Sequence, residues 1–280
     1  MMNILIPTDF SKNANEALFY ALKVFKNEPC KFYLLHAFEV EMPIFPGKNY
    51  KEEGKLRYET KLSGVNKELN DTLLSVSVIS DTSDHSFETL ASTNSLVESI
   101  QKSIKKFKID LVVMGTKGAS GLKEIFIGSN TVKVIKSIHE IPLLIIPTEI
   151  NEFNLSKIAF ATAFDKKYSS RSINYLKTYC ELHKSNLEII HVDNLKEFTD
   201  EENEHRKILE ENLSCINYSI NLITKNTSTE KDIRDYLNTI DYDLLIMINY
   251  KHDDFYNWMN ESVVNKMGYH TKIPFLILPE

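Results

Sequence analysis

Short apolar runs alternate with amphipathic segments along the first half of the chain. The apolar runs are typical of buried strands, and the longer segments carry apolar residues three or four positions apart, which predicts helices. The predicted helix 11–25 begins at Ser11, a residue type that often caps helices. The predicted helix 48–69 is so charged that we expect it to be exposed. The predicted strands are residues 3–7, 32–38, 73–79, 111–114 and 143–146, and the predicted helices are 11–25, 48–69, 96–107 and 129–138.

This alternation predicts a doubly wound α/β domain, a parallel sheet with helices on both faces, because parallel strands need crossover connections. Ligands of such sheets bind at the carboxyl ends of the strands, where the strand order reverses. The turn after Pro7 and the loop after Met114 are therefore the places where we expect a ligand.

The second half of the chain repeats the apolar pattern of the first. Four matched segments in the same order indicate an internal duplication, with one domain over residues 1–147, a linker over 148–155 and a second domain over 156–280. Segments 157–164, 187–191, 243–247 and 273–279 correspond to 4–10, 32–36, 110–114 and 141–147.

Composition and charge narrow the class of protein. With 42% hydrophobic and 26% charged residues the chain has a globular composition, and no apolar run is long enough to span a membrane. The net charge is −6, with the acid excess in residues 148–280 and no basic stripe, so we expect no nucleic-acid partner. The start of the sequence lacks a secretion signal and the three cysteines form no CxxC pair, which predicts a cytoplasmic protein without a zinc site of that type.

Four of the eight glycines fall within fourteen residues directly after the apolar run 110–114. Glycine lets backbone N–H groups approach an anion closely, and Gly128-Ser129 opens a predicted helix whose first N–H groups favour a phosphate. The spacing Gly115-x2-Gly118-x9-Gly128-Ser129 is not that of a P-loop, and it follows the fourth strand, unlike a dinucleotide-binding fingerprint. The same spacing also suits a tight turn with a glycine-rich flap, so the glycines alone leave both interpretations open.

The glycine spacing, taken with the segments 7–11 and 35–37 and with Met114, resembles the universal stress protein family in its ATP-binding branch. The resemblance covers nearly the whole chain as a fold and only the first half as a nucleotide motif. It implies two tandem doubly wound domains, similar to adenine nucleotide alpha hydrolases and with the layering of flavodoxin, that form a pseudo-dimer.

The resemblance also implies roles for individual residues. Asp9 would hydrogen-bond the ribose or adenine, and Ala37 would meet the adenine ring through its backbone. Gly115 and Gly118 would line the ribose and phosphate path, and the start of the following helix would hold the phosphates through backbone amides and hydroxyls. The expected site residues are Pro7, Thr8, Asp9, Ala37, Met114, Gly115, Gly118, Gly128, Ser129, Asn130 and Thr131. Asp9 could instead cap the helix 11–25, and Lys117 could balance phosphate charge or be a solvated loop lysine.

The second half departs from this motif. When its fourth strand is aligned with that of the first half, the positions of Gly115, Gly118 and Gly128 are occupied by Ile248, Lys251 and Glu261. Ala163 occupies the position of Asp9. A carboxylate at the phosphate position would repel the ligand, so we expect no nucleotide in the second domain.

Other chemistry-bearing residues give weaker signals. Glu201 with His205, and the cluster 252–254, could contribute to a metal site, but a solvated acidic face explains both. His36 and His191 end equivalent strands, where a partly buried, hydrogen-bonded histidine is the simpler interpretation. No serine or cysteine has a recognisable histidine and acid partner, so we predict no metal, no catalytic residue and at most slow, incidental ATP hydrolysis.

These observations favour a stress-response or regulatory protein that binds an adenine nucleotide, ATP with Mg²⁺ or else AMP or another adenylate, in its first domain. The alternative is an interaction scaffold of the same fold with both sites idle. An enzyme of the adenine nucleotide alpha hydrolase group is a third hypothesis, but its Ser-Gly-Gly-x-Asp-Ser loop is absent after the first strand. Each half ends in an apolar strand closed by proline, and an exposed apolar edge strand is a liability unless it is paired. In single-domain members of the family that the chain resembles, these final strands typically pair between two subunits. The resemblance therefore implies that the two strands pair antiparallel within this chain, with a further homodimer left open.

Overall fold

The computed structural model describes residues 1–40, 50–79, 84–116, 128–147, 150, 155–194, 197–249 and 273–280. These residues form two compact units. The first unit comprises the described residues up to 116 together with 128–138, and the second comprises those from 139 onward. No helix in the described ranges is both long and apolar enough to cross a bilayer.

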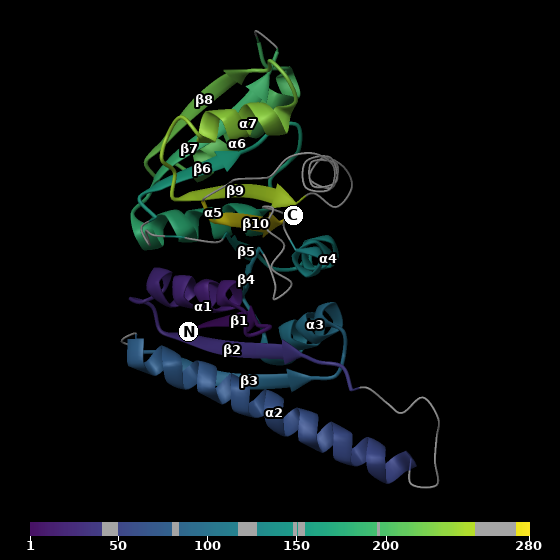
Figure 1. Ribbon diagram of the computed structural model, residues 1–280. Helices are drawn as coiled ribbons and strands as arrows, with labels where there is room; N and C mark the ends of the chain where they lie inside the picture. The colour runs from purple at the N-terminus through teal and green to yellow at the C-terminus, as the bar shows by residue number, and fades with distance from the viewer. Residues whose placement is uncertain are drawn as a thin grey trace. The chain divides into compact units, whose positions relative to one another are not determined.

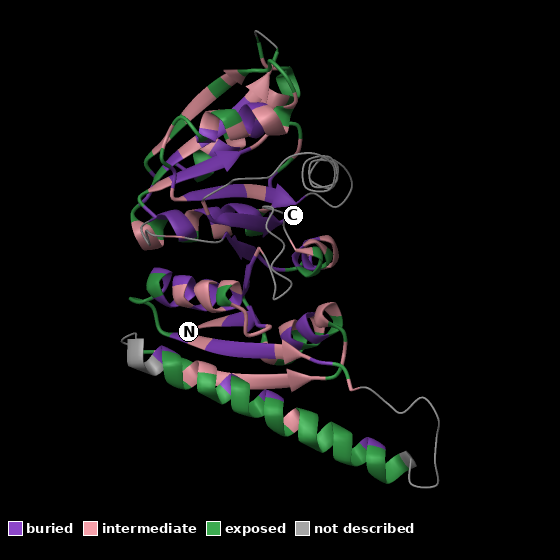
Figure 2. Cartoon of the chain, viewed as in Figure 1, coloured by how far each residue is buried: buried purple, intermediate pink, exposed green. Residues whose placement is uncertain are grey.

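The first unit is built on a parallel sheet with the strand order β3-β2-β1-β4. The central strand β1 is apolar and fully buried at Ile4, Leu5 and Ile6 (Figure 2), which explains why it pairs on both sides. The four strands are β1 (Met2–Pro7), β2 (Cys30–Ala37), β3 (Ser86–Ser92) and β4 (Leu111–Gly115).

Helices connect these strands and cover the sheet (Figure 1). The first helix packs on β1 and β4, the third packs on β1 and β2, and the fourth contacts the third. Serine side chains at Ser11 and Ser95 cap the first and third helices by accepting backbone N–H groups at 3.2 and 3.4 Å. The helices are α1 (Lys12–Val24), α2 (Tyr50–Ile79), α3 (Leu96–Phe107) and α4 (Ser129–Ser137).

The predicted strand 73–79 is wrong, because this segment is the last part of the long helix α2. Its alternating valines and serines favour a strand locally. In the structure Val65, Leu69 and Val76 form a buried stripe at helical spacing, and α2 packs on β2 and β3. Tertiary packing thus overrides local propensity, and the third strand is β3. Most of α2 is exposed, as its charge predicts (Figure 2).

The second unit contains a sheet with the order β5-β10-β9-β6-β7-β8. All neighbours are parallel except β5 and β10, which pair antiparallel with Leu144 opposite Leu276. This pairing confirms the expectation that the apolar strands at the ends of the two halves pair within the chain. The strands are β5 (Leu143–Ile146), β6 (Lys157–Ala161), β7 (Asn186–Asp193), β8 (Tyr218–Thr224), β9 (Leu244–Asn249) and β10 (Phe275–Pro279).

Three helices belong to the second unit. The side chains of Ser169 and Thr199 cap the first and second of these helices. The second helix has a complete capping box, in which the Glu202 side chain accepts the Thr199 backbone N–H. They are α5 (Ser170–His183), α6 (Asp200–Asn212) and α7 (Thr229–Leu237). The α/β alternation predicted for both halves is therefore present, and the fold class is confirmed.

Candidate functional site

A cavity of about 320 Å³ opens in the first unit at the carboxyl ends of its strands. The chain leaves β1 toward β2 on one side and returns to β4 on the other, so this is the point where the strand order reverses. The loop after β1, the ends of β2 and β4 and the start of α4 all contribute to the wall. The lining residues are Pro7, Thr8, Asp9, Ala14, His36, Ala37, Leu96, Met114, Gly115, Gly128, Ser129, Asn130 and Thr131.

The structure brings together ten of the eleven site residues expected from the sequence, and the eleventh, Gly118, lies outside the described residues, as does Lys117. The sequence interpretation did not include Ala14, His36 or Leu96 in this wall. Their positions in the sequence could have indicated that they line the cavity. His36 lies near the end of a parallel strand, and Ala14 and Leu96 lie in the first turns of helices that follow parallel strands.

Short hydrogen bonds fix the turn between β1 and α1. The Phe10 backbone N–H donates to Thr8 Oγ1 at 3.0 Å, and the Ser11 N–H donates to Asp9 Oδ1 at 3.1 Å. Phe10 itself adopts a left-handed backbone with φ of 63°. The residue that caps α1 is Ser11, so the Asp9 carboxylate supports the cap residue and also borders the cavity.

His36 is held in place by the same turn. Its Nδ1 lies 2.8 Å from the Thr8 carbonyl oxygen, and its ring centroid lies 4.5 Å from that of Phe10. Because a carbonyl oxygen only accepts, Nδ1 is the donor, and this bond fixes the ring orientation. This geometry agrees with the structural interpretation of His36.

The Thr131 hydroxyl joins α4 to the end of β4. Thr131 is buried and its Oγ1 donates to the Gly115 carbonyl oxygen at 3.0 Å. A hydroxyl whose hydrogen is used in this way does not donate it to a phosphate. The resemblance assigns both the hydroxyl and the backbone N–H of Thr131 to phosphate binding. This geometry leaves only the backbone N–H of Thr131 for an anion.

The N-terminus of α4 lacks a side-chain cap. Gly128 occupies the cap position, the first intrahelical bond runs from Val132 N–H to the Gly128 carbonyl at 3.0 Å, and the first turn holds no acidic residue. The N–H groups of Ser129, Asn130 and Thr131 precede that bond and therefore have no partner within the helix. Such a terminus carries partial positive charge and is suited to an anion. Ser or Thr side chains cap α1, α3, α5 and α6, whereas α7, like α4, has no side-chain cap bond.

The corresponding turn of the second unit is altered. Thr162 and Phe164 repeat Thr8 and Phe10, including a left-handed φ of 58° at Phe164, and Ala163 between them is exposed. The helix cap follows Thr162 by seven residues, whereas Ser11 follows Thr8 by three. The longer loop carries the buried Tyr168, whose hydroxyl lies 2.7 Å from the Thr162 hydroxyl. Thr8 borders the cavity in the first half, whereas its counterpart Thr162 in the second half is in contact with the side chain of Tyr168.

The weaker candidates are also located. His205 is buried and its Nδ1 lies 2.8 Å from the Phe164 carbonyl oxygen, whereas Glu201 is exposed, which agrees with a structural role for His205. The cluster 252–254 lies outside the described residues. His191 is buried and hydrogen-bonded through Nδ1, like His36.

Comparison with known proteins identifies the family. The model of the universal stress protein family matches residues 1–147. The chain belongs to the universal stress protein family. Universal stress protein MJ0531 of Methanocaldococcus jannaschii is 29% identical over 143 residues, a match that covers 51% of this chain and 80% of the relative.

Solved structures of universal stress proteins extend the likeness to both halves as a fold. A universal stress protein from Archaeoglobus fulgidus superposes with a TM-score of 0.66 at 19% identity, over 99% of this chain and 96% of that one. A putative universal stress protein from Pseudomonas aeruginosa gives a TM-score of 0.62 at 13% identity, over 100% of this chain and 93% of that one. The whole length of this chain therefore has the universal stress protein fold.

Proposed function

We propose that this universal stress protein binds one adenine nucleotide, ATP with Mg²⁺, in the cavity of its first domain, and that it acts as a stress-response or regulatory protein. The observation that carries the proposal is the uncapped N-terminus of α4. Gly128, Ser129, Asn130 and Thr131 all border the cavity, and the helix begins there with three N–H groups that have no partner within the helix. An anion of the size of a phosphate fits such a terminus because the N–H groups and the helix dipole act together.

The rest of the wall suits a nucleoside. Its apolar members, among them Leu96 and Met114, offer contacts for a base, and the Asp9 carboxylate can accept a hydrogen bond from a ribose hydroxyl. Mg²⁺ prefers oxygen ligands and keeps several waters, so it would enter with the nucleotide, held by phosphate oxygens, with Asp9 as the carboxylate of the wall. AMP or another adenylate would use the same base and ribose contacts.

We further propose that the second domain, residues 156–280 after a linker at 148–155, binds no nucleotide. Support comes from the altered turn, where Ala163 replaces the carboxylate of Asp9 and Tyr168 contacts Thr162. The antiparallel pairing of β5 with β10 supports an internal pseudo-dimer, in which the final strands of the two halves pair as strands of two subunits would. We assign no catalytic residue, and we expect ATP turnover to be slow and incidental.

A charge placed at the start of α4 tests the proposal. Ser129 is the first residue of α4 and is exposed, so Ser129→Asp leaves packing intact and puts a carboxylate on the phosphate position. Isothermal titration of the full chain with ATP and Mg²⁺ is expected to give one site in the wild type and at least about tenfold weaker binding in Ser129→Asp, the effect of about 1.4 kcal/mol of repulsion.

Ser170→Asp is the matched control. Ser170 is the exposed first residue of α5 in the second domain, so this variant adds the same charge at the same helix position. We expect its ATP affinity to equal that of the wild type. Two equivalent sites, or equal binding by the wild type and Ser129→Asp, would contradict the proposal. Absence of binding to ATP and AMP alike would favour the alternative, an interaction scaffold with idle sites.

A further inference from the structure

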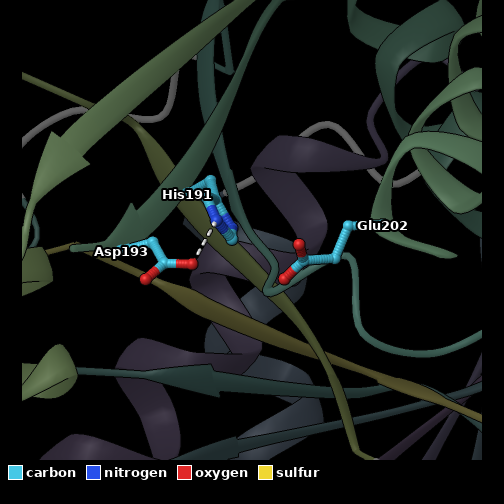
Figure 3. Close-up of side chains that lie close together, drawn as sticks. All are labelled: His191, Asp193 and Glu202. Atoms are coloured by element: carbon cyan, nitrogen blue, oxygen red, sulfur yellow. Dashed lines mark ion pairs between the residues drawn. The ribbon is translucent and has the colours of Figure 1, made fainter. Parts of the chain in front are cut away.

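His191, Asp193 and Glu202 form a cluster in the second unit (Figure 3). His191 and Asp193 lie at the end of β7, and Glu202 lies in the first turn of α6. One ligand atom from each residue lies within 4.8 Å of those of the other two. Among the described residues this is the group whose histidine and carboxylates converge in the manner of a metal site.

The imidazole of His191 is oriented as a ligand. Its Nδ1 lies 3.0 Å from the Thr162 carbonyl oxygen, which makes Nδ1 the donor and leaves the lone pair of the neutral ring on Nε2. The residue is 4% exposed, and its Nε2 is buried without a hydrogen-bond partner among the residues that the structure describes. A metal-binding histidine characteristically donates its other ring N–H to a carbonyl or carboxylate in this way.

The buried Nε2 faces a carboxylate. It lies 3.7 Å from Asp193 Oδ2, the contact drawn as a dashed line in Figure 3. A lone pair and a carboxylate oxygen repel each other unless a cation or a proton lies between them. A buried polar nitrogen aimed at a carboxylate therefore indicates a positively charged partner at this point.

Glu202 is held toward the cluster by the start of its own helix. Its Oε2 accepts the Thr199 N–H at 2.8 Å, which is one bond of the capping box, and it also accepts the Thr199 hydroxyl at 2.9 Å. Both bonds use the same oxygen, so Oε1 is the atom that a cation would engage. Carboxylates that ligate metals are commonly oriented by hydrogen bonds of this kind.

Among the described residues, the first half has an aromatic residue at the position that corresponds to Asp193. His36 has the same Nδ1 contact to a threonine carbonyl as His191, but the residue two positions later is Phe38, whose ring is stacked 6.4 Å from that of His36. The second half has Asp193 at that position. Two positions after the duplicated histidine, a carboxylate is present only in the half that lacks the glycine motif.

We propose that His191 Nε2, Asp193 and Glu202 bind a divalent transition-metal ion, Zn²⁺ or an ion of similar preference. One imidazole and two carboxylates are a donor set that such ions accept, with water in the remaining position. Metal–ligand bonds of about 2.0–2.2 Å require the ligand atoms to move closer together than they are. Asp193 has 29% of its side chain exposed and Glu202 is half-buried, so neither side chain is fully enclosed by packing.

Titration of the untagged full chain with ZnCl₂, and separately with CoCl₂, tests the site. We expect one ion per chain, and at least about tenfold weaker binding in Asp193→Asn and in Glu202→Gln, since even the loss of an outer partner of a metal ligand weakens affinity about 10- to 100-fold. Glu201→Gln removes the same charge from an exposed neighbour on α6 and is expected to bind like the wild type. Circular dichroism of each variant shows that the fold is retained.

Nuclear magnetic resonance of the His191 ring tests directly whether Nε2 binds the ion, which the carboxylate variants do not report. In long-range ¹H–¹⁵N spectra, added Zn²⁺ should shift the Nε2 resonance of His191 while the Nδ1–H signal persists. Absence of metal binding, equal affinity in Asp193→Asn and the wild type, or an unshifted Nε2 signal would each overturn the proposal, and the first of these would leave a proton on His191 as the positive partner. No nucleotide is present in these measurements, so their failure is distinguishable from failure of the ATP proposal.

Discussion

The β-carbon that Gly115 lacks would lie 2.8 Å from the main-chain oxygen of Asn13. It would also lie 3.1 Å from the carbonyl carbon of that residue, so the obstacle is backbone and cannot rotate away. Gly115 ends β4, and Asn13 lies in the first turn of α1, which packs on β4. The glycine that the sequence suggests for a ligand is thus required, first, by the close approach of a helix to a strand.

Gly115→Ala is therefore expected to destabilise the protein, by about 1–3 kcal/mol, because overpacking against backbone forces the helix and strand apart. Urea unfolding of the variant measures this difference. Gly64→Ala is the matched control, since a β-carbon at Gly64 meets nothing within 4 Å and Gly64 lies inside α2. There the same substitution should stabilise, by about 0.5–1 kcal/mol, through helix propensity. Equal effects at the two positions would contradict this account.

Replacement of Thr131 by valine should cost about 1–3 kcal/mol of unfolding free energy, because it leaves the buried Gly115 carbonyl without its donor. Valine keeps the shape of threonine, so the loss reports the hydrogen bond. Thr131→Ser retains the hydroxyl and is expected to lose less. If the valine and serine variants unfold at the same urea concentration, the hydrogen bond contributes nothing measurable.

Acid should weaken the second unit through Glu188. Burial opposes ionisation of this side chain, but hydrogen bonds from Tyr236, Tyr242 and Asn221, with the charge of Lys157, outweigh it and lower the pKa of Glu188 below its ordinary value of 4.5. A carboxyl with a depressed folded pKa stabilises the fold fully above its unfolded pKa. The contribution is then lost as the pH falls from 4.5 through the lower folded value.

Glu188→Gln is expected to flatten the acid limb of a stability-versus-pH curve measured by urea unfolding. Tyr236→Phe removes one donor and should flatten it in part. The two variants should agree with the wild type in the slope of stability against pH near neutrality. A wild-type acid limb unchanged in Glu188→Gln would assign the pH dependence to other carboxyls.

Thiol chemistry should distinguish the three cysteines. Burial raises the pKa of Cys30 to about 11 and that of Cys180 to about 12, and both side chains are buried, whereas Cys215 is exposed. The thiolate is the reactive form, so a chromogenic disulfide reagent at pH 8 should titrate one thiol rapidly in the folded protein and three after denaturation. Cys215→Ser should abolish the rapid phase. Two rapid thiols in the wild type would indicate that one of the buried cysteines opens to solvent.

The sequence by itself determined the order of strands and helices, the duplication, and the edge of the first sheet at which chemistry-bearing residues gather. These features depend on periodicity and on the geometry of parallel strands, which are properties of neighbours along the chain. The pairing of the apolar strands at the ends of the two halves was instead implied by the resemblance to the universal stress protein family, and Leu144 does lie opposite Leu276.

Only the tertiary structure decided what depends on contacts between distant residues. The segment 73–79 is helical because its apolar stripe finds a sheet to cover, although its own residues favour a strand. Thr131 donates to Gly115, sixteen positions earlier, so the local motif could not assign its hydroxyl. A ring nitrogen of His191 lies within 4.8 Å of a Glu202 carboxylate oxygen because β7 and α6 bring them together, and no spacing in the sequence specifies that approach. Packing across the fold, which local patterns do not encode, sets which polar groups face each other.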